Sequence, residues 1–254
     1  MISLIEEVFK QNDLFYIIFA IVAAVLPALF WLWYIYKKDK HEKEPILLLT
    51  ALVIGGIISA FMAYFLEVLT SFVEALIPDD IMVLLILMTI VSAMLIGIIE
   101  ESCKYVMMKL ISWRSKQFNY TFDGVVYAIY VSLGFALMEN ILYVFGYGLE
   151  VVLPRALLTI PAHMGFGAYM GAYYGEAKIY NVQGNPEKCK AYLKRGLVMA
   201  IILHGIYDSL AMLSFSSFFF WLFYIFVALM DLSVFVLIRS RSNNDRNISP
   251  WTVI

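Results

Sequence analysis

The segment that decides the fold begins Val83-Leu84-Leu85-Ile86-Leu87-Met88 and continues to Ile98-Ile99-Glu100-Glu101-Ser102-Cys103-Lys104. It is long and apolar enough to cross a bilayer, yet it carries two adjacent carboxylates and a lysine. Lys104 lies four residues after Glu100, so the two side chains share one face of a helix. A charge in the middle of a membrane helix costs about 2.5 to 3.5 kcal/mol, so these charges indicate a functional site.

The composition of the whole chain is that of a polytopic membrane protein. Of its 254 residues, 63% are hydrophobic and 15% are charged. The formal net charge of −2 leaves no basic face for nucleic acid. Cys103 falls inside an expected helix and Cys189 in an expected cytosolic loop, so we expect no disulfide between them.

Seven stretches have the roughly 20 apolar residues that a helix needs to cross the bilayer. They run approximately over residues 14–36, 46–69, 81–110, 122–147, 151–175, 194–213 and 218–238. Lysine and arginine are concentrated in the loops after the first, third and fifth stretches and in the C-terminal tail. This asymmetry predicts the N-terminus outside and the C-terminus in the cytosol. We therefore expect one all-α integral membrane domain over residues 1–254, with about seven transmembrane helices and a catalytic core at about 81–213.

Three further stretches place polar residues inside the expected helices: Phe135-Ala136-Leu137-Met138-Glu139-Asn140, Pro161-Ala162-His163 and His204-Gly205-Ile206-Tyr207-Asp208. Consecutive membrane helices run antiparallel, so two residues share one depth when the midpoint of their numbers falls on the turn between them. This rule holds for three successive pairs: Glu100 with Glu139, Glu139 with His163, and His163 with His204. We expect these side chains in one layer, although Glu100 fits it only if its helix is tilted or starts late.

Two spacings support close contact in this layer. Gly167, Gly171 and Gly175 follow His163 at intervals of four, and such a stripe of small residues lets another helix approach closely. Asp208 shares a helix face with His204, so it can accept a hydrogen bond from the imidazole or join the site directly.

Each polar residue also has a purely structural explanation. Glu100 and Lys104 alone could form an ion pair, and a single histidine is more often a packing residue than a ligand. Asn140 could serve an interhelical hydrogen bond, and Asp123 a favourable carboxylate in the first turn of a helix. Their common depth favours function for the acids and histidines of the layer. Asp231 has no partner at its depth, and its role stays open.

The charge of the layer adds a constraint. Four carboxylates and one lysine give a formal charge of about −3 when the histidines are neutral, which a low-dielectric interior does not tolerate. Either some carboxylates are protonated or a divalent cation is bound. Two imidazoles with carboxylates suit zinc, with water in an open position. The chain has no HExxH motif, so separate helices would have to assemble such a site.

Five short motifs follow one another along the chain: Glu100-Glu101-x-x-Lys104, Phe122-Asp123-Gly124, Phe135-x-x-x-Glu139-Asn140, the isolated His163 and His204-x-x-x-Asp208. Together, over residues 96–210, they resemble the PrsW family of bacterial intramembrane proteases. That family is distantly similar to the CAAX prenyl endopeptidase and bacteriocin-immunity group. It often shows three consecutive glutamates, and Ile99 stands where the first would be.

The resemblance implies hydrolysis of peptide bonds within or beside the plasma membrane of a bacterium. Family members make the site-1 cut in a single-pass anti-sigma factor, which begins the release of an extracytoplasmic-function sigma factor under envelope stress. The family is classed with the metalloproteases. Its CAAX relatives have been argued to work through glutamate and histidine without an essential metal, so both mechanisms stay open.

The resulting hypothesis is a membrane-embedded endopeptidase with zinc as the expected metal. Glu100 or Glu101 acts as general base on a water molecule. Zinc is held, or the water positioned, by Glu139, His163 and His204. The residues expected to orient these groups, stabilise the oxyanion or bind substrate are Lys104, Asn140, Asp208 and Asp123.

Two other classes of function remain. A proton- or ion-coupled transporter also places carboxylates and histidines near the middle of the membrane. It is opposed by the absence of an inverted repeat and of matched spans broken by glycine or proline. A receptor or scaffold without catalysis is the third alternative, in which replacing Glu100, Glu139 or His204 would change binding but no turnover.

Overall fold

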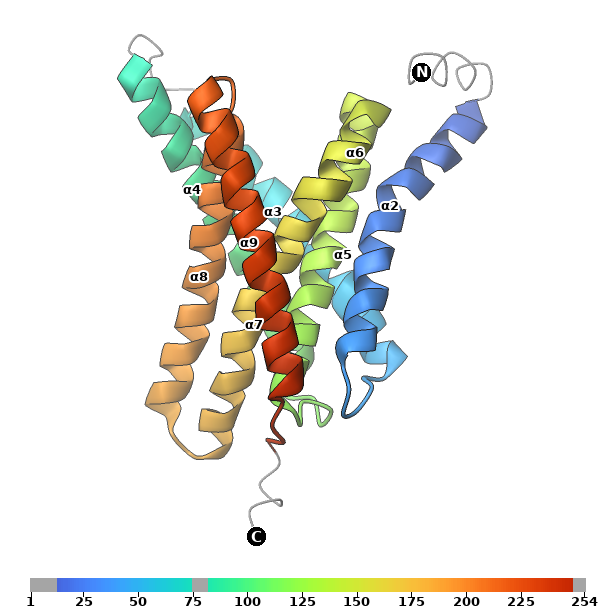
Figure 1. Cartoon of the computed structure of the whole chain (residues 1–254), viewed down its shortest axis with the longest axis vertical. Coiled ribbons are helices and arrows are strands. Elements are labelled where there is room, and N and C mark those ends of the chain that lie inside the picture. The colour runs from blue at the N-terminus through green and yellow to red at the C-terminus, as the bar shows by residue number, and fades with distance from the viewer. Residues whose placement is uncertain (1–12, 75–81, 249–254) are drawn as a thin grey trace.

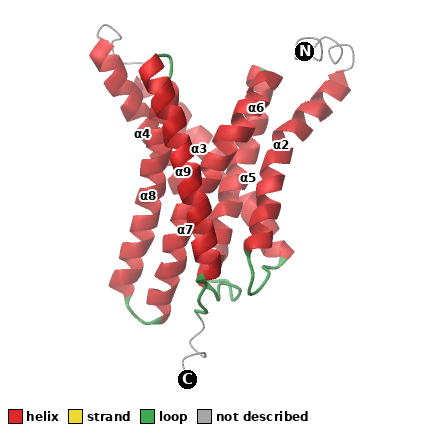
Figure 2. Ribbon diagram, in the orientation of Figure 1, coloured by secondary structure: helices red, strands yellow, loops and turns green. Residues whose placement is uncertain are grey.

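The computed structural model describes residues 13–74 and 82–248, which are almost entirely helical (Figures 1 and 2). Seven helices in this part of the chain are long and apolar enough to cross a membrane. The prediction of an all-α bundle with about seven transmembrane helices is confirmed. Because the number of these spans is odd, the first of them starts and the last of them ends at opposite ends of the bundle (Figure 1). Which end faces the cytosol stays a prediction.

The helices in chain order are α2 (Asp13–Lys38), α3 (Ile46–Glu74), α4 (Met82–Ser112), α5 (Thr121–Tyr147), α6 (Val152–Pro154), α7 (Ile160–Val182), α8 (Pro186–Met212) and α9 (Ser217–Asn243). A 3-10 turn, η1 (Leu149–Val151), precedes α6, and a π-helical turn, η2 (Arg155–Thr159), joins α6 to α7. Residues from Leu149 to Val182 therefore form one span.

The ends of the predicted spans lie within five residues of these helices except where α7 and α8 meet. The apolar stretches were expected to end at residue 175 and to resume at 194, whereas the helices run to Val182 and start again at Pro186. The intervening segments are polar but still helical, because a helix can continue beyond the apolar part that hydropathy detects. The Asn185 side chain accepts a hydrogen bond from the Lys188 N–H and caps the start of α8.

Helix α5 is the centre of the bundle. In the most apolar part of α5, 72% of the residues are buried. The helix packs against α2, α3 and α7. Gly171 and Gly175 of α7 lie directly against Gly124 of α5, where an added Cβ would meet the backbone of the neighbouring helix. The predicted close approach along this glycine stripe is confirmed. At its far end α5 stops at Gly148, whose φ of 82° turns the chain back toward α7.

Candidate active site

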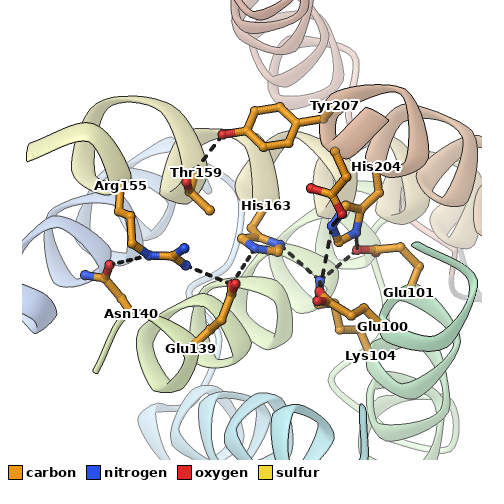
Figure 3. Close-up of polar contacts among 11 residues, drawn as sticks. Glu100, Glu101, Lys104, Glu139, Asn140, Arg155, Thr159, His163, His204 and Tyr207 are labelled. Carbon is orange, nitrogen blue, oxygen red and sulfur yellow. Dashed lines mark hydrogen bonds and ion pairs between the residues drawn. The ribbon is translucent and has the colours of Figure 1, made fainter. Parts of the chain in front are cut away.

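Helix α4 supplies two carboxylates and a lysine to the interior of the bundle. Glu100, Glu101 and Lys104 are 6%, 0% and 1% exposed. The Lys104 Nζ lies 3.0 Å from Glu100 Oε2 and 2.7 Å from Glu101 Oε1. Gly97, one turn before Glu100, lies against Gly205 of α8, so the two helices approach closely at this level. One ammonium group therefore bridges two buried carboxylates (Figure 3).

His163 of α7 connects this group to α5. Its Nδ1 lies 3.0 Å from Lys104 Nζ, and its Nε2 lies 2.9 Å from Glu139 Oε2. An ammonium can only donate, so Nδ1 accepts from Lys104 while Nε2–H donates to the carboxylate. This contact pattern fixes the tautomer of His163. The lone pair of Nδ1 faces the Lys104 ammonium, which lies against the two glutamates of α4.

His204 of α8 lies between carboxylates on both sides of its ring. Nδ1 is 2.9 Å from Glu101 Oε1, and Nε2 is 3.2 Å from Asp208 Oδ2 and 3.8 Å from Glu100 Oε2. The ring stacks on Phe166, with centroids 4.7 Å apart. Packing and hydrogen bonding together hold the imidazole in one orientation, and Asp208 is the hydrogen-bond partner expected from its spacing.

Acids and imidazoles from α4, α5, α7 and α8 therefore meet in one connected network, as their common depth predicts. The network also contains Arg155, which none of the sequence motifs includes. Arg155 is 7% exposed, and its Nη2 lies 3.0 Å from Glu139 Oε2. The sequence did hold a signal for it, because the midpoint of Glu139 and Arg155 falls at Tyr147, the last residue of α5.

Two residues assigned to the site by sequence have other surroundings. Asn140 donates from Nδ2 to the Ala24 carbonyl of α2 at 2.6 Å and accepts from Arg155 Nε at 2.8 Å, so it joins helices and holds the arginine. Asp123 lies outside the network, about 24 Å from Glu139 along α5. Its carboxylate accepts hydrogen bonds from the Asn119 and Tyr120 N–H groups at the start of α5. These contacts fit the alternative role of a carboxylate in the first turn of a helix, and the assignment of Asp123 to the site stays a prediction.

A cavity of about 590 Å³ opens beside the network. Charged and polar groups line one wall, and alanines and aromatic rings line the rest, including Ala60, Ala63, Tyr143 and Tyr207. Glu100, His163 and His204 all reach this space, whereas Glu101 is not among its lining residues. The volume lies in the usual range for a ligand site and is large enough for a peptide segment with water.

Four residues of the network form a group that could hold a metal ion: Glu100, Glu101, His163 and His204. One ligand atom from each lies within 4.8 Å of the others. Two imidazoles with two carboxylates match the donors that zinc prefers. Glu101 Oε2 is buried and has no hydrogen-bond partner among the described residues. An oxygen that binds a cation would lack a hydrogen-bond partner in the same way when the cation is absent. The residues fit a metal, provided that the Lys104 ammonium moves aside.

The fold and the site together define the class of protein: a multi-pass membrane protein with a buried group of glutamates and histidines beside a cavity. Residues 44–233 match the family model described as PrsW family intramembrane metalloprotease. The chain therefore belongs to the PrsW family of intramembrane proteases, as its motifs predict.

The curated relatives agree. The chain is 28% identical to Protease PrsW of Clostridioides difficile over 228 residues, which are 88% of this chain and 87% of the relative. It is 32% identical to Protease PrsW of Oceanobacillus iheyensis over 233 residues, 87% of this chain and 95% of the relative. The identity to Protease PrsW of Bacillus subtilis is 31% over 192 residues, 75% of this chain and 82% of the relative. No solved structure matches. The predicted location in a bacterial membrane is confirmed.

Proposed function

We propose that this protein is a zinc-dependent endopeptidase that makes the first cut in a single-pass anti-sigma factor under envelope stress. In this proposal the chain is one integral membrane domain, its catalytic core spans about 81–213, and its N-terminus faces outward. The observation that carries the proposal is the group Glu100, Glu101, His163 and His204 beside the cavity. Family membership supports proteolysis over transport.

Glu100 is the general base in this proposal, and Glu101 is not. Glu100 lines the cavity, where substrate and water enter, whereas Glu101 is fully buried and tied to Lys104 and His204. Neutral water is a poor nucleophile, so Glu100 takes its proton as the oxygen attacks the peptide carbonyl, and returns it to the leaving nitrogen. A bound zinc would lower the pKa of that water and polarise the carbonyl.

His163 and His204 hold the metal, and Glu139 supports His163. The sequence predicts Glu139 itself as a ligand, and that assignment stays untested. The contact of its carboxylate with His163 Nε2 favours another role, because metal-binding histidines usually donate their second N–H to a carboxylate. His204 has carboxylates at both ring nitrogens, Glu101 at Nδ1 and Asp208 at Nε2, so the nitrogen that does not bind the metal would donate its N–H to a carboxylate in the same way.

A co-expression experiment tests the proposal. Single-pass anti-sigma factors carrying a tag at each end are expressed in bacteria with the wild-type protein, with Glu100→Gln or with Glu150→Gln. Glu150 lies exposed in η1, outside the cavity lining, and is the matched control. We expect wild type and Glu150→Gln to yield the cut fragment, and Glu100→Gln to leave the substrate whole at equal protein level. Cleavage by Glu100→Gln at the wild-type rate would overturn the assignment.

The metal is tested separately. Purified wild-type protein should contain zinc, and His163→Ala and His204→Ala should each lower the zinc content. Wild-type cleavage that survives complete removal of metal by a chelator would instead support the metal-free glutamate and histidine mechanism.

A further inference from the structure

Arg155 lies in a local irregularity of the helix that carries His163. The Ile160 N–H bonds to the Arg155 carbonyl across five residues, which makes η2 a single π turn. Successive residues of an α-helix turn by about 100°, so residues eight apart, such as Arg155 and His163, would differ by about 80°. A π turn takes up one extra residue, which reduces that difference to about 20°. The irregularity therefore brings Arg155 onto the same face as His163.

Both side chains meet one oxygen of Glu139. The carboxylate Oε2 is 2.9 Å from His163 Nε2 and 3.0 Å from Arg155 Nη2. The side chain of Glu139 is 19% exposed toward the cavity, so it has room to rotate away from the histidine. The buried guanidinium opposes this rotation, because separating the two charges would leave each of them desolvated without a partner.

The guanidinium is itself held from two sides. Its Nε donates to Asn140 Oδ1 at 2.8 Å, and Asn140 is anchored to the Ala24 carbonyl of α2. Its central carbon lies 3.9 Å from the centre of the Tyr143 ring. Arg155 is thus a fixed support, and not a mobile side chain that happens to reach a carboxylate.

We propose that Arg155 is a positioning residue, which holds Glu139 against His163 and so keeps His163 Nδ1 directed at the place between Glu100 and Glu101 that the Lys104 ammonium occupies. The proposal rests on the proposed function, in which His163 holds the metal. Arg155 acts through Glu139 and does not need to touch the substrate.

A double-mutant cycle tests this with a cleaved anti-sigma factor purified in detergent. We expect Arg155→Gln to lower kcat about 10- to 100-fold, with KM within about threefold of wild type. Arg155→Lys keeps the positive charge but lacks the planar guanidinium that contacts Glu139 and Asn140 together. Its kcat should lie between those of Arg155→Gln and wild type. If Arg155 acts through Glu139, Arg155→Gln adds no further loss to Glu139→Gln. Additive losses, or a raised KM with unchanged kcat, would overturn the proposal.

A second measurement needs no substrate. Nitrogen NMR of 15N-histidine-labelled protein, with His163 assigned by His163→Gln, reports which ring nitrogen carries the proton. We expect Nε2–H in wild type. In Arg155→Gln we expect the same tautomer with a shifted Nε2 signal, because Lys104 still donates to Nδ1 while the hydrogen bond from Nε2–H to Glu139 is weakened. An unchanged His163 signal in that variant would overturn the positioning role. This readout separates failure of the positioning role from failure of the anti-sigma factor assignment.

The matched control is Arg241→Gln. Arg241 pairs with Glu176 at 2.6 Å at the other end of the bundle, away from the cavity. It should leave kcat and the His163 signal at their wild-type values. The same losses in Arg241→Gln would mean that removing any arginine–glutamate pair disturbs the site, and the proposal would fail.

Discussion

Replacing Gly171 by alanine should separate the two helices that carry Glu139 and His163. An alanine Cβ at this position would lie 2.6 Å from Val125 Cα and 2.9 Å from Ala128 Cβ, and closer still to the Gly124 carbonyl oxygen. Real Cβ atoms essentially never come within 3.0 Å of such atoms. Since two of these contacts are with backbone, no side-chain rotation relieves them. Helix α7 must move away from α5 by several tenths of an ångström.

The expected cost follows from overpacking. Inserting a methyl group into a well-packed interior costs about 1 to 3 kcal/mol. For a chain of this size that corresponds to a fall of about 2 to 12 °C in the unfolding midpoint. The 2.9 Å bond between Glu139 and His163 should loosen as well, so cleavage should fall roughly tenfold or more. Tryptophan fluorescence in detergent measures the midpoint, and cleavage of the anti-sigma factor measures the activity.

Gly146→Ala is the control for this experiment. Gly146 also lies in a helix, but a Cβ there meets nothing within 4 Å. Alanine is favoured over glycine in a helix by up to about 1 kcal/mol, so this variant should be as stable as wild type or slightly more stable. A Gly171→Ala protein that unfolds at the wild-type midpoint would refute the close approach of α5 and α7.

Two further variants test the charges. Lys104→Gln removes the positive charge shared by Glu100 and Glu101, so the metal-free protein should lose about 3 to 5 kcal/mol of its free energy of unfolding. Added zinc should restore the unfolding midpoint. A midpoint that zinc does not restore would contradict a metal site at these residues. Burial raises the pKa of Glu44, in the loop between α2 and α3, to about 7 from 4.5. The folded state thus binds this proton more tightly than the unfolded state, and stability falls as pH rises from about 4.5 to 7. Glu44→Gln should flatten that fall in the unfolding midpoint, and an unchanged slope would count against it.

The spans could be predicted because hydropathy records what the bilayer requires. The ends of these helices could not be predicted, since α7 and α8 continue past Gly175 and begin before Lys194, in polar segments where hydropathy no longer constrains the structure. The sequence predicts which residues share a depth, because depth follows from rise per residue alone. It does not predict how a side chain is rotated about its helix when that helix contains a π turn.

The site shows the same division. The midpoint rule predicts that Glu100, Glu139, His163 and His204 share one depth. It does not predict which of their atoms are in contact. Glu139 was expected to be a ligand, whereas its carboxylate lies against His163 Nε2 and Arg155. A lone arginine after Pro154 is typical of a membrane boundary, so nothing local distinguishes a buried arginine from an interfacial one. Only its partner Glu139 on the neighbouring helix α5 shows that this arginine is buried.

Adding Arg155 changes the charge balance of the site and leads to a last prediction. The network joins four carboxylates to two cations, Lys104 and Arg155, and leaves two negative charges when both histidines are neutral. A buried site does not carry two unbalanced negative charges. The metal-free protein must therefore bind two protons on these carboxylates to neutralise them. Zinc supplies the same two positive charges, and its binding should therefore expel protons. Calorimetric titration with zinc in two buffers of different ionisation enthalpy counts them. We expect close to two protons per zinc. Binding without proton release would show that the metal-free network tolerates its charge, and would remove the electrostatic reason for a metal.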